Sequence, residues 1–504
     1  MNQETATFKR FSNNVFDRNL LSNKEYKEMI DNFITTVSLL TKEENRITCN
    51  EPQIINCMIE FGIIDSEEGF LEIKKQLSKE MFEKLQDSIS IVINDNLLEY
   101  DEIAKYNKAY RVKIIEQEDQ NKPTLVDLFC GAGGLSLGLT QIGFRVIFAN
   151  DIEKSALRTY SFNHPEIDGK RITMGGIEDI AYNVNDYINE SVDLIAGGPP
   201  CQGFSSANRQ RIIDDPRNIL YKYYVECVKR LNPKFFIMEN VKGMKNVADQ
   251  VVEDFNTNLQ IGYEIDYEIL NAKYLGIPQN RERLIYIGVR EDVKRKHNIC
   301  ANKIFQLLKR SYKEKLNIMD AINSLKPLEA SRAKNSTELG DEISGNKISS
   351  VNTKFENEYV SKINMDKKMN LTFNHKARYN NDRDIEIYSR MLPGDKSDSP
   401  RIADIMPYKS RSHMFKDKYY KLIPNIPCKT ITAHMKFDCN MYIHPYQARG
   451  LTPREAARIQ SYPDDYFFLG VYTKTYQQIG NSVPPLMARA LGEEIIKYLQ
   501  TETK

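Results

Sequence analysis

The feature that most constrains the fold is the stretch of residues 192–205, in which a short apolar run leads into Gly-Gly-Pro-Pro and then Cys201. The apolar part has the length of one buried strand. Proline fixes φ and glycine adopts conformations closed to other residues, so this turn holds the thiol in a defined position. Open α/β sheets place their functional groups beyond the carboxyl ends of strands. The pattern favours a nucleophile at Cys201; the alternative is a buried structural cysteine.

A regular alternation of apolar runs and helical patterns begins at Thr124. The first run leads into a glycine loop, residues 130–134, and after a helical pattern the second run ends at Asp151. This order predicts a doubly wound, Rossmann-like α/β sheet. The loop lacks the Gly-Lys-Ser/Thr of a P-loop and, at Ser136, the third glycine of the dinucleotide fingerprint. It therefore favours a nucleoside without a pyrophosphate, with Asp151 accepting hydrogen bonds from the ribose hydroxyls.

Two further apolar runs carry charged groups at their ends. One stops at Glu239, and the other follows Arg281 and Arg283. If these strands lie beside the strand that precedes Cys201, then a thiol, a carboxyl and a guanidinium meet in one site. The alternative is a surface acid and a solvated pair of arginines.

Length and composition limit the class of protein. A chain of 504 residues with 41% hydrophobic and 28% charged residues is typical of a soluble protein with two or three domains. No apolar run approaches the roughly 20 residues that cross a bilayer, and the polar first ten residues do not resemble a secretory signal. The eight cysteines show no CxxC spacing. We therefore expect reduced thiols, no metal site, no membrane partner and a cytoplasmic location.

Charge is distributed unevenly along the chain. Residues 1–120 hold 15 Lys and Arg against 23 Asp and Glu, whereas residues 401–450 hold 9 against 3. A polyanion is drawn to the second region and repelled by the first. Basic residues and tyrosines alternate over residues 405–425, which favours a nucleic-acid surface; the alternative is an ordinary solvated face. The basic residues that we assign to DNA contact are Lys409, Arg411, Lys416 and Lys418.

Residues 1–120 predict a mainly helical module. A capping box begins at Ser22, Asn50 can cap a second helix, and a third is expected over residues 70–92. Residues 117–122 read as a linker. This module contains no nucleotide or metal motif. Its acidic character favours a protein partner or self-association over direct DNA binding, and a domain that only packs against the rest is an equal alternative.

The C-terminal part contains two clear local signals. Thr452-Pro453-Arg454-Glu455 predicts a helix start, with Thr452 as the N-cap and Glu455 closing the capping box. Residues 480–485 predict a tight turn before a last helix over residues 486–499.

Six of these segments, in this order, resemble the motifs of the DNA cytosine-5 methyltransferases of bacterial restriction–modification systems. The segments are 127–134, 198–205, 239–241, 279–283, 449–460 and 480–485. The resemblance covers residue 124 to the C-terminus. It implies a catalytic domain over residues 121–292, a target-recognition region over 293–448 and a return to the catalytic domain over 449–504.

The resemblance also implies a chemistry. The methyl donor is S-adenosyl-L-methionine, and the acceptor is carbon 5 of a flipped-out cytosine in double-stranded DNA, attacked at carbon 6 by Cys201. The implied catalytic residues are Cys201, Glu239, Arg281 and Arg283. The implied cofactor contacts are Phe129, Gly131, Gly133, Gly134, Asp151, Ile152, Glu178, Asp179, Pro199, Asn481 and Ser482. Gln202 and Ser205 are implied to contact DNA beside the target base.

The chain departs from the family at Gly176, where the family has the Asp of a Gly-Asp-Ile unit that binds the adenine amino group. The adenine contact is therefore expected to shift to Glu178 or Asp179, or to be lost. Two other functions stay open on the sequence alone. One is a tRNA cytosine-5 methyltransferase on the same fold, and the other is a DNA-binding regulator that acts through residues 1–120.

Overall fold

The structure is a computed structural model of the whole chain. It describes residues 27, 30, 34, 49–60, 63–64, 66–93, 121–164, 166–167, 169–200, 220–259, 262–313, 315–334, 340–350, 357–365, 371–407, 418–437 and 439–499.

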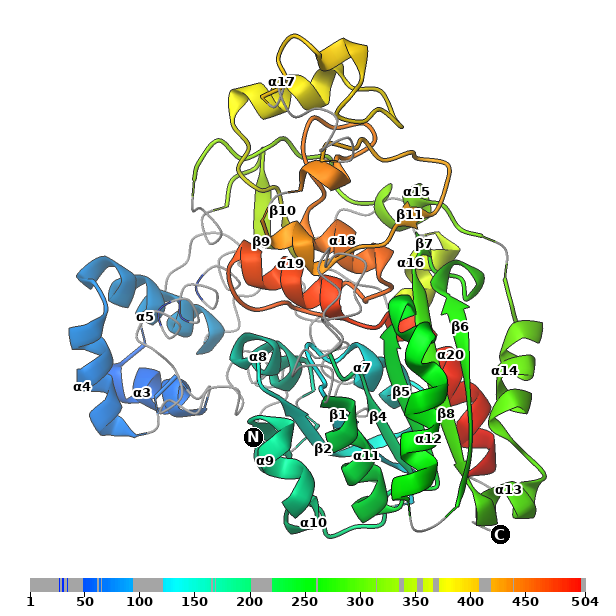
Figure 1. Cartoon of the computed structure of the whole chain (residues 1–504). Helices are drawn as coiled ribbons and strands as arrows, with labels where there is room; N and C mark the ends of the chain where they lie inside the picture. Colours follow the sequence, from blue (N-terminus) through cyan, green and yellow to red (C-terminus); the bar gives the residue numbers. More distant parts are fainter. Residues whose placement is uncertain are drawn as a thin grey trace.

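A seven-stranded sheet in the order β3-β2-β1-β4-β5-β8-β6 forms the centre of the molecule (Figure 1). The strands are β1 (Thr124–Leu128), β2 (Arg145–Asp151), β3 (Ile172–Met174), β4 (Leu194–Gly197), β5 (Phe235–Val241), β6 (Tyr263–Asn271) and β8 (Glu282–Arg290). The first five are parallel, whereas β8 runs antiparallel to both β5 and β6. Strands β1 and β4 are buried along their whole length, as expected for parallel strands covered on both faces. The predicted doubly wound α/β fold is confirmed.

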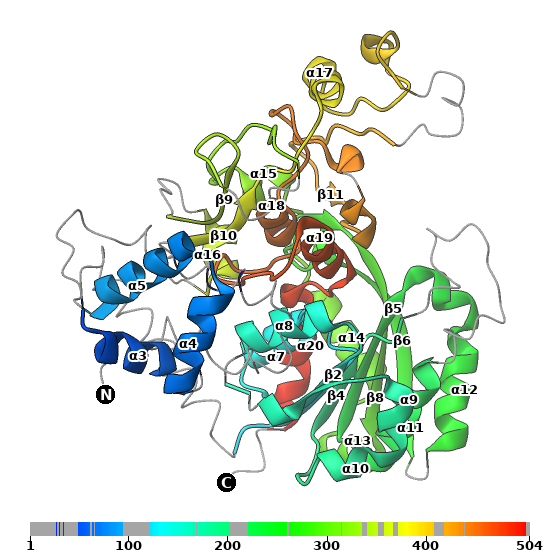
Figure 2. The same cartoon turned by 90° about the vertical axis from the view of Figure 1, so that its left-hand side faces the viewer.

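Helices cover both faces of the sheet (Figure 2). One face carries α11 (Leu220–Leu231) and α12 (Ala248–Asn258), and the other carries α7 (Gly134–Thr140), α14 (Ala301–Arg310) and α20 (Pro485–Ile495). Alternate residues of each strand enter the two cores: Ile195 faces the α11 side, and its neighbours Leu194 and Ala196 face the α7 side. This is the two-residue period of a strand buried on both faces.

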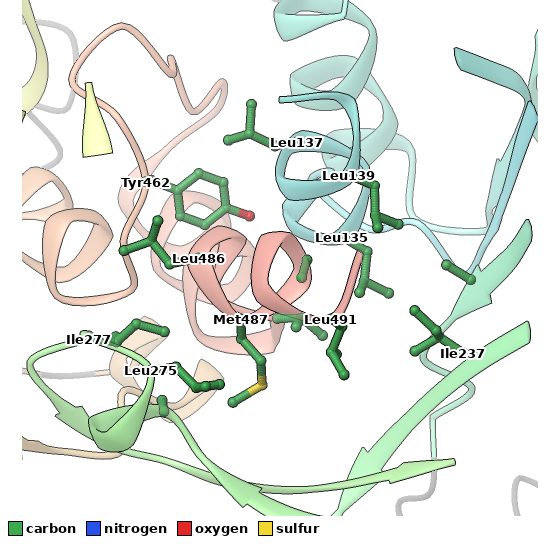
Figure 3. Close-up of a cluster of buried hydrophobic side chains, with 14 of the residues drawn as sticks. Leu135, Leu137, Leu139, Ile237, Leu275, Ile277, Tyr462, Leu486, Met487 and Leu491 are labelled. Carbon is green, nitrogen blue, oxygen red and sulfur yellow. The ribbon is translucent and has the colours of Figure 1, made fainter. Parts of the chain in front are cut away.

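Helices α7 and α20 pack closely on the second face (Figure 3). Leu135 and Leu139 of α7 lie beside Leu491 of α20, with Ile237 of β5 in the same cluster. A Cβ at Gly138 would come within 2.2 Å of a backbone oxygen of α20, so this helix pair requires glycine there. The C-terminal helix thus completes the core of the domain that begins at residue 121. Helix α20 ends at Ile495, four residues before the predicted end at residue 499, and residues 496–498 form a 3-10 turn.

Helices α13 (Glu291–His297) and α14 also belong to this core. Val293, Ile304 and Leu308 are buried with the strands of the main sheet. The chain therefore stays on the sheet to about residue 310, later than the expected boundary at residue 293.

A smaller, less regular part follows and lies above the sheet in Figure 1. It contains α15 (Ile318–Ile322), α16 (Glu358–Ile363), α17 (Asp382–Arg390) and an antiparallel pair, β9 (Gly345–Ser350) and β10 (Leu371–Lys376). Strand β11 (Cys428–Lys429) pairs with β7 (Gln279–Asn280). The chain then returns through α18 (Pro453–Ile459) and α19 (Tyr472–Asn481). The predicted capping box is confirmed, because Thr452 Oγ1 accepts from the Glu455 amide at 3.1 Å and Glu455 accepts from the Thr452 amide at 2.7 Å.

The N-terminal module has a core of its own, formed by α3 (Glu51–Glu60), α4 (Glu67–Gln76) and α5 (Lys79–Ile93). The predicted cap at Asn50 is confirmed, since its Oδ1 accepts from the Gln53 amide at 3.0 Å. The prediction of a single helix over residues 70–92 was wrong, because two helices, α4 and α5, cover this stretch. The backbone is extended at Leu77, and Ser78 Oγ accepts from the Met81 amide to begin α5. The capping box at Ser22 and residues 117–120 lie outside the described residues.

Candidate active site

A cavity of about 400 Å³ lies at the carboxyl edge of the parallel strands. Its walls come from the glycine loop, the end of β2, the segment after β4, the end of β5 and the turn that follows α19. Eight of the predicted cofactor residues line it: Phe129, Gly131, Gly134, Asp151, Ile152, Pro199, Asn481 and Ser482. The sequence therefore located this site through segments as far apart in the chain as Phe129 and Ser482.

The glycine loop has an unusual backbone. Phe129, Gly131 and Gly133 have φ values of 56°, 54° and 85°, a backbone region that residues other than glycine rarely adopt. Gly133 does not line the cavity. A Cβ there would come within 2.6 Å of the Tyr466 hydroxyl and 2.9 Å of the Tyr160 ring. This glycine is needed for the packing beneath the loop, and its neighbours form the cavity wall.

Asp151 is held by two backbone amides. Its Oδ2 accepts from Gly131 and its Oδ1 from Glu153, both at 2.8 Å. Burial raises the pKa of Asp151, and these two hydrogen bonds oppose the rise. A carboxylate oxygen has two lone pairs, so each can still accept a second hydrogen bond from a ligand in the cavity. The next residue, Ile152, leaves 72% of its surface exposed and offers an apolar contact at the cavity edge.

Glu239 and Arg283 form an ion pair on the opposite wall. Arg283 Nε lies 2.6 Å from Glu239 Oε1, and both side chains are mostly buried. In the antiparallel register of β5 and β8, Arg283 lies opposite Val241. Val241 is two residues beyond Glu239 on β5, so Arg283 and Glu239 are diagonal neighbours on the same face of the sheet. Burial lowers the pKa of Arg283, and Glu239 offsets part of this effect. The pair presents an acid and a hydrogen-bond donor to the same space.

The segment before Cys201 enters the cavity beside this pair. A Cβ at Gly198 would lie 3.0 Å from Glu239 Oε2, and Asn240 Nδ2 donates to the Pro199 carbonyl at 2.9 Å. The described chain stops at Pro200, which lines the cavity. Cys201 itself, with Gln202 and Ser205, lies outside the described residues.

Arg281 occupies a different position from Arg283. It is fully buried, and it does not line the cavity. Its guanidinium donates to the carbonyls of Ile431, Gly480 and Ser482 at 2.7, 3.1 and 2.8 Å. The two predicted catalytic arginines are therefore separated, one at the cavity and one behind its wall.

Glu178 and Asp179 lie on the short helix α9 (Ile177–Ile180), exposed and outside the cavity lining. The Glu178 carboxyl covers Gly176, since a Cβ at that glycine would come within 2.6 Å of it. The Gly175 amide donates to the Asp151 carbonyl at 3.1 Å. The acid at 178 thus takes the space that a side chain at 176 would need, next to the end of β2.

The predicted DNA-contact cluster is described only in part. Lys409, Arg411 and Lys416 lie outside the described residues, and Lys418 is partly exposed. The same stretch includes Lys421, which is 6% exposed and donates to the Tyr388 carbonyl at 2.8 Å. Burial lowers the pKa of Lys421. At least one basic residue of this stretch, Lys421, is therefore buried and hydrogen-bonded inside the protein instead of lying on the surface.

Residues 428–437, a segment that we call the arm, were predicted as part of the target-recognition region of residues 293–448 but were not singled out within it. It starts in β11 and ends at Phe437, whose side chain is 61% exposed. Arg378 donates to the carbonyls of Met435, Lys436 and Phe437 at 3.3, 3.2 and 2.8 Å. The neighbouring lysine and phenylalanine at 436 and 437 were a readable basic and aromatic signal.

Two negative findings apply to the described residues alone. Among them, no helix is long and apolar enough to cross a membrane. In the same part of the chain, no three His, Cys, Asp or Glu side chains gather as metal ligands would.

Comparison with known proteins places the chain in a family. A family model for the C-5 cytosine-specific DNA methylases matches residues 123–497. The type II methyltransferase M.DdeI of Desulfomicrobium norvegicum is 34% identical and aligns with 75% of this chain and 89% of the relative. M.AgeI of Thalassovita gelatinovora, also a type II methyltransferase, is 31% identical over 73% of this chain and 98% of its own length.

A solved structure shows the same fold. This E. coli prophage protein, assigned as a DNA modification methyltransferase, has 24% identity and a TM-score of 0.58 over 75% of this chain and 99% of its own. The match of sequence family, fold and cavity identifies the chain as a member of the C-5 cytosine-specific DNA methylase family and as a DNA cytosine methyltransferase.

Proposed function

We propose that the chain methylates carbon 5 of a flipped-out cytosine in double-stranded DNA through a covalent adduct of Cys201, with S-adenosyl-L-methionine as the methyl donor. The observation that carries the proposal is the Glu239–Arg283 pair, which faces the cavity where the chain leads into Cys201. When a nucleophile attacks a cytosine ring, negative charge builds up on N3 and O2. A neighbouring acid can share a proton with N3, and a neighbouring guanidinium can donate to O2.

The residues have separate tasks in this mechanism. Cys201 adds as a thiolate to carbon 6 of the ring, which makes carbon 5 nucleophilic. The added electron density spreads to N3 and O2; Glu239 shares a proton with N3, and Arg283 donates to O2. After methylation solvent water takes the carbon-5 proton, the electron pair of that C–H bond re-forms the double bond between carbons 5 and 6, and the bond from carbon 6 to sulfur breaks, so that Cys201 departs as a thiolate. A free thiol with a pKa of about 8.5 is only a few per cent ionised at neutral pH, so the positive charge of Arg283 assists.

The cavity fits the proposed methyl donor. When bound, S-adenosyl-L-methionine would supply an electrophilic methyl group. Asp151 can accept hydrogen bonds from the two ribose hydroxyls, and Ile152 offers an apolar face to the adenine. Gly131 permits close approach of the ligand to the backbone. Glu178 and Asp179 stay proposed contacts for the adenine amino group.

Base flipping requires energy from elsewhere in the complex. Taking a base out of the stack costs roughly a few kcal/mol, which contacts to phosphates and base edges must offset. We assign these contacts to residues 311–448, with Lys409, Arg411, Lys416 and Lys418 among them. The similarity to type II methyltransferases supports a role of this methylation in protecting host DNA against a companion nuclease. A protein partner or self-association through residues 1–120 also stays a prediction.

Covalent trapping tests the mechanism. The target is first mapped by bisulfite sequencing of DNA from cells that express the protein. With S-adenosyl-L-methionine supplied, a duplex with 5-fluorocytosine at that position should then form an adduct with the enzyme that survives denaturation, because after methylation the fluorine cannot leave as a proton does. Cys201→Ser should form none. Cys300→Ser, at a partly exposed position outside the cavity lining, is the matched control and should trap normally. Trapping by the Cys201→Ser variant would refute the proposal.

A further inference from the structure

We propose that Arg281 is a positioning residue that couples DNA recognition to cofactor binding, by tying the arm to the wall of the cofactor cavity. The inference rests on the proposed function, because it takes the cavity as the cofactor site and the arm as part of the DNA-binding surface. It assigns to Arg281 a role different from the catalytic one that the sequence suggested.

The first part of the argument is the geometry of the Arg281 guanidinium. One nitrogen donates to Ile431 of the arm at 2.7 Å, and the other donates to Gly480 and Ser482 at 3.1 and 2.8 Å. Gly480 and Ser482 both line the cavity. A planar guanidinium holds its donors in a fixed fork, so one rigid group sets the arm and the cavity wall at a fixed separation.

The second part is the contact between the two segments themselves. A Cβ at Gly480 would lie 2.2 Å from the Ala433 nitrogen and from the Thr432 carbonyl carbon. The arm therefore lies directly on the last turn of α19, with no side chain between the two backbones. Gln279 adds a second link, since its Oε1 accepts from the Ile431 amide at 3.0 Å and its Nε2 donates to Gln460 Oε1 at the same distance.

The third part is the outer end of the arm. Phe437 is 61% exposed, His434 is exposed, and the Lys436 ammonium lies 5.1 Å from the centre of the Phe437 ring. A basic residue beside exposed aromatic rings is the combination that contacts nucleic acid. Arg378 holds this end through three carbonyls, and it is not among the described residues that line the cavity. The arm thus has an inner clamp, Arg281, and an outer clamp, Arg378.

The fourth part is the cost of separating these segments. Arg281 is a fully buried cation whose hydrogen bonds go to neutral carbonyls, and its pKa is lowered by burial and by Arg283. A buried charge that loses such partners is strongly unfavourable. The arm and the turn at 480–482 therefore move as one body. A ligand that orders one of them favours the ordered state of the other, and by linkage the effect is reciprocal.

The test is the change in DNA affinity caused by cofactor product. The dissociation constant of the mapped target duplex is measured with and without saturating S-adenosylhomocysteine. We expect the product to tighten binding by the native enzyme by about 5- to 150-fold, the usual range of coupling between two sites. Arg281→Lys keeps the charge but cannot span both segments, and should reduce this factor to below about twofold, while each ligand still binds alone.

Arg378→Lys is the matched control, because it loosens the same arm at the end remote from the cavity. It should weaken DNA binding equally with and without the product, so that the coupling factor keeps its native value. If Arg281→Lys does not fold, as judged by its thermal unfolding, Gly480→Ala replaces it: the added methyl separates arm and turn while Arg281 remains, and should lower the factor in the same way.

A native coupling factor in Arg281→Lys or in Gly480→Ala overturns the inference, and so does an equal loss of coupling in Arg378→Lys. These outcomes are separate from a failure of the proposed function. That failure would appear in the native enzyme, as absence of binding to S-adenosylhomocysteine or to duplex DNA.

Discussion

Two regions of the molecule use the same kinds of charged residue for different ends. The cavity holds Asp151 and the Glu239–Arg283 pair. A second cluster of charges, which we call the joint, lies around α18. It holds two bidentate pairs, Arg449–Glu455 and Arg458–Asp464, in which every nitrogen-to-oxygen distance is 2.7 Å. Glu239 and Arg283 lie in segments that resemble the motifs of one family, and so do Arg449, Glu455 and Arg458, so motif membership alone does not separate catalysis from support.

The difference lies in how completely the acceptors are occupied. In the joint, Glu455 also accepts from the Thr452 amide, and Asp464 also accepts from Asn364 at 3.0 Å. Burial alone would raise the pKa of Glu455, but Arg449 and two histidines outweigh it and hold that pKa well below its usual range. In the cavity, the one side-chain partner of Glu239 among the described residues is Arg283, and Glu239 borders open space. Charges with spare hydrogen-bonding capacity bind ligands, and saturated charges hold segments together.

The largest expected effect separates the two regions by activity. Glu239→Gln should lower the methyl-transfer rate by about 10²–10⁴, because the amide cannot share a proton with N3 of the ring. Folding stability should fall less than it does when a saturated pair of the joint is broken, because the glutamine oxygen still accepts from Arg283 and the pair borders an open cavity. Transfer of labelled methyl groups at saturating substrates measures the rate, and denaturant unfolding provides the control. A rate within threefold of native would place Glu239 with the supporting charges.

The second effect is the reverse, a loss of stability. Glu455→Gln leaves Arg449 buried without its countercharge, which should cost about 3–5 kcal/mol in the free energy of unfolding. Glu493→Gln removes an exposed partner of Arg489 and should cost less than about 1 kcal/mol. Urea unfolding of both variants measures the contrast. Equal losses would show that burial of the ion pair does not matter.

The third effect is a dependence of stability on pH. Burial lowers the pKa of His375 and of His444 to about 4, so both are neutral in the folded protein at pH 7. As the pH falls below about 6.5, the unfolded chain binds protons that the folded chain excludes, so stability falls until about pH 4. The expected loss at pH 5 is about 2 kcal/mol for each histidine. Urea unfolding at pH 7 and at pH 5 measures this loss, and the His375→Gln variant should lose less stability between the two pH values. Equal stability of the native protein at both pH values would contradict the lowered pKa of the two histidines.

The sequence predicted the cavity well because its residues follow strand ends, and parallel strands bring those ends to one edge. It could not separate Arg281 from Arg283, which are two positions apart as neighbours on one strand face would be. Arg281 precedes β8, in the bend after β7, where the two-residue period of a strand no longer sets the direction of a side chain. Its acceptors lie 150 and about 200 positions away, and a local pattern carries no signal of such distant partners.

Other differences have local causes that the sequence did contain. The buried positions Ala301, Ile304, Phe305 and Leu308 of α14 have helical spacing, so the amphipathic pattern was present beyond the expected boundary at residue 293. Charge counting assigned residues 405–425 to a surface, yet Lys421 places its ammonium on a carbonyl of α17. A lysine carries a long apolar stem, and its position depends on what the tertiary fold offers to the charged end.

The smallest effect compares two isoleucines of one segment. Ile152 directly follows the last residue of β2 at the cavity and is 72% exposed, whereas Ile147 in the middle of the strand is 3% exposed. Ile152→Ala removes an apolar contact to the adenine and should weaken binding of S-adenosylhomocysteine about fivefold, or about 1 kcal/mol, with stability unchanged. Ile147→Ala opens a core cavity and should cost about 2–5 kcal/mol of stability without a direct effect on affinity. Calorimetric titration and urea unfolding separate the two, because only a residue that touches the ligand weakens binding while the fold keeps its stability.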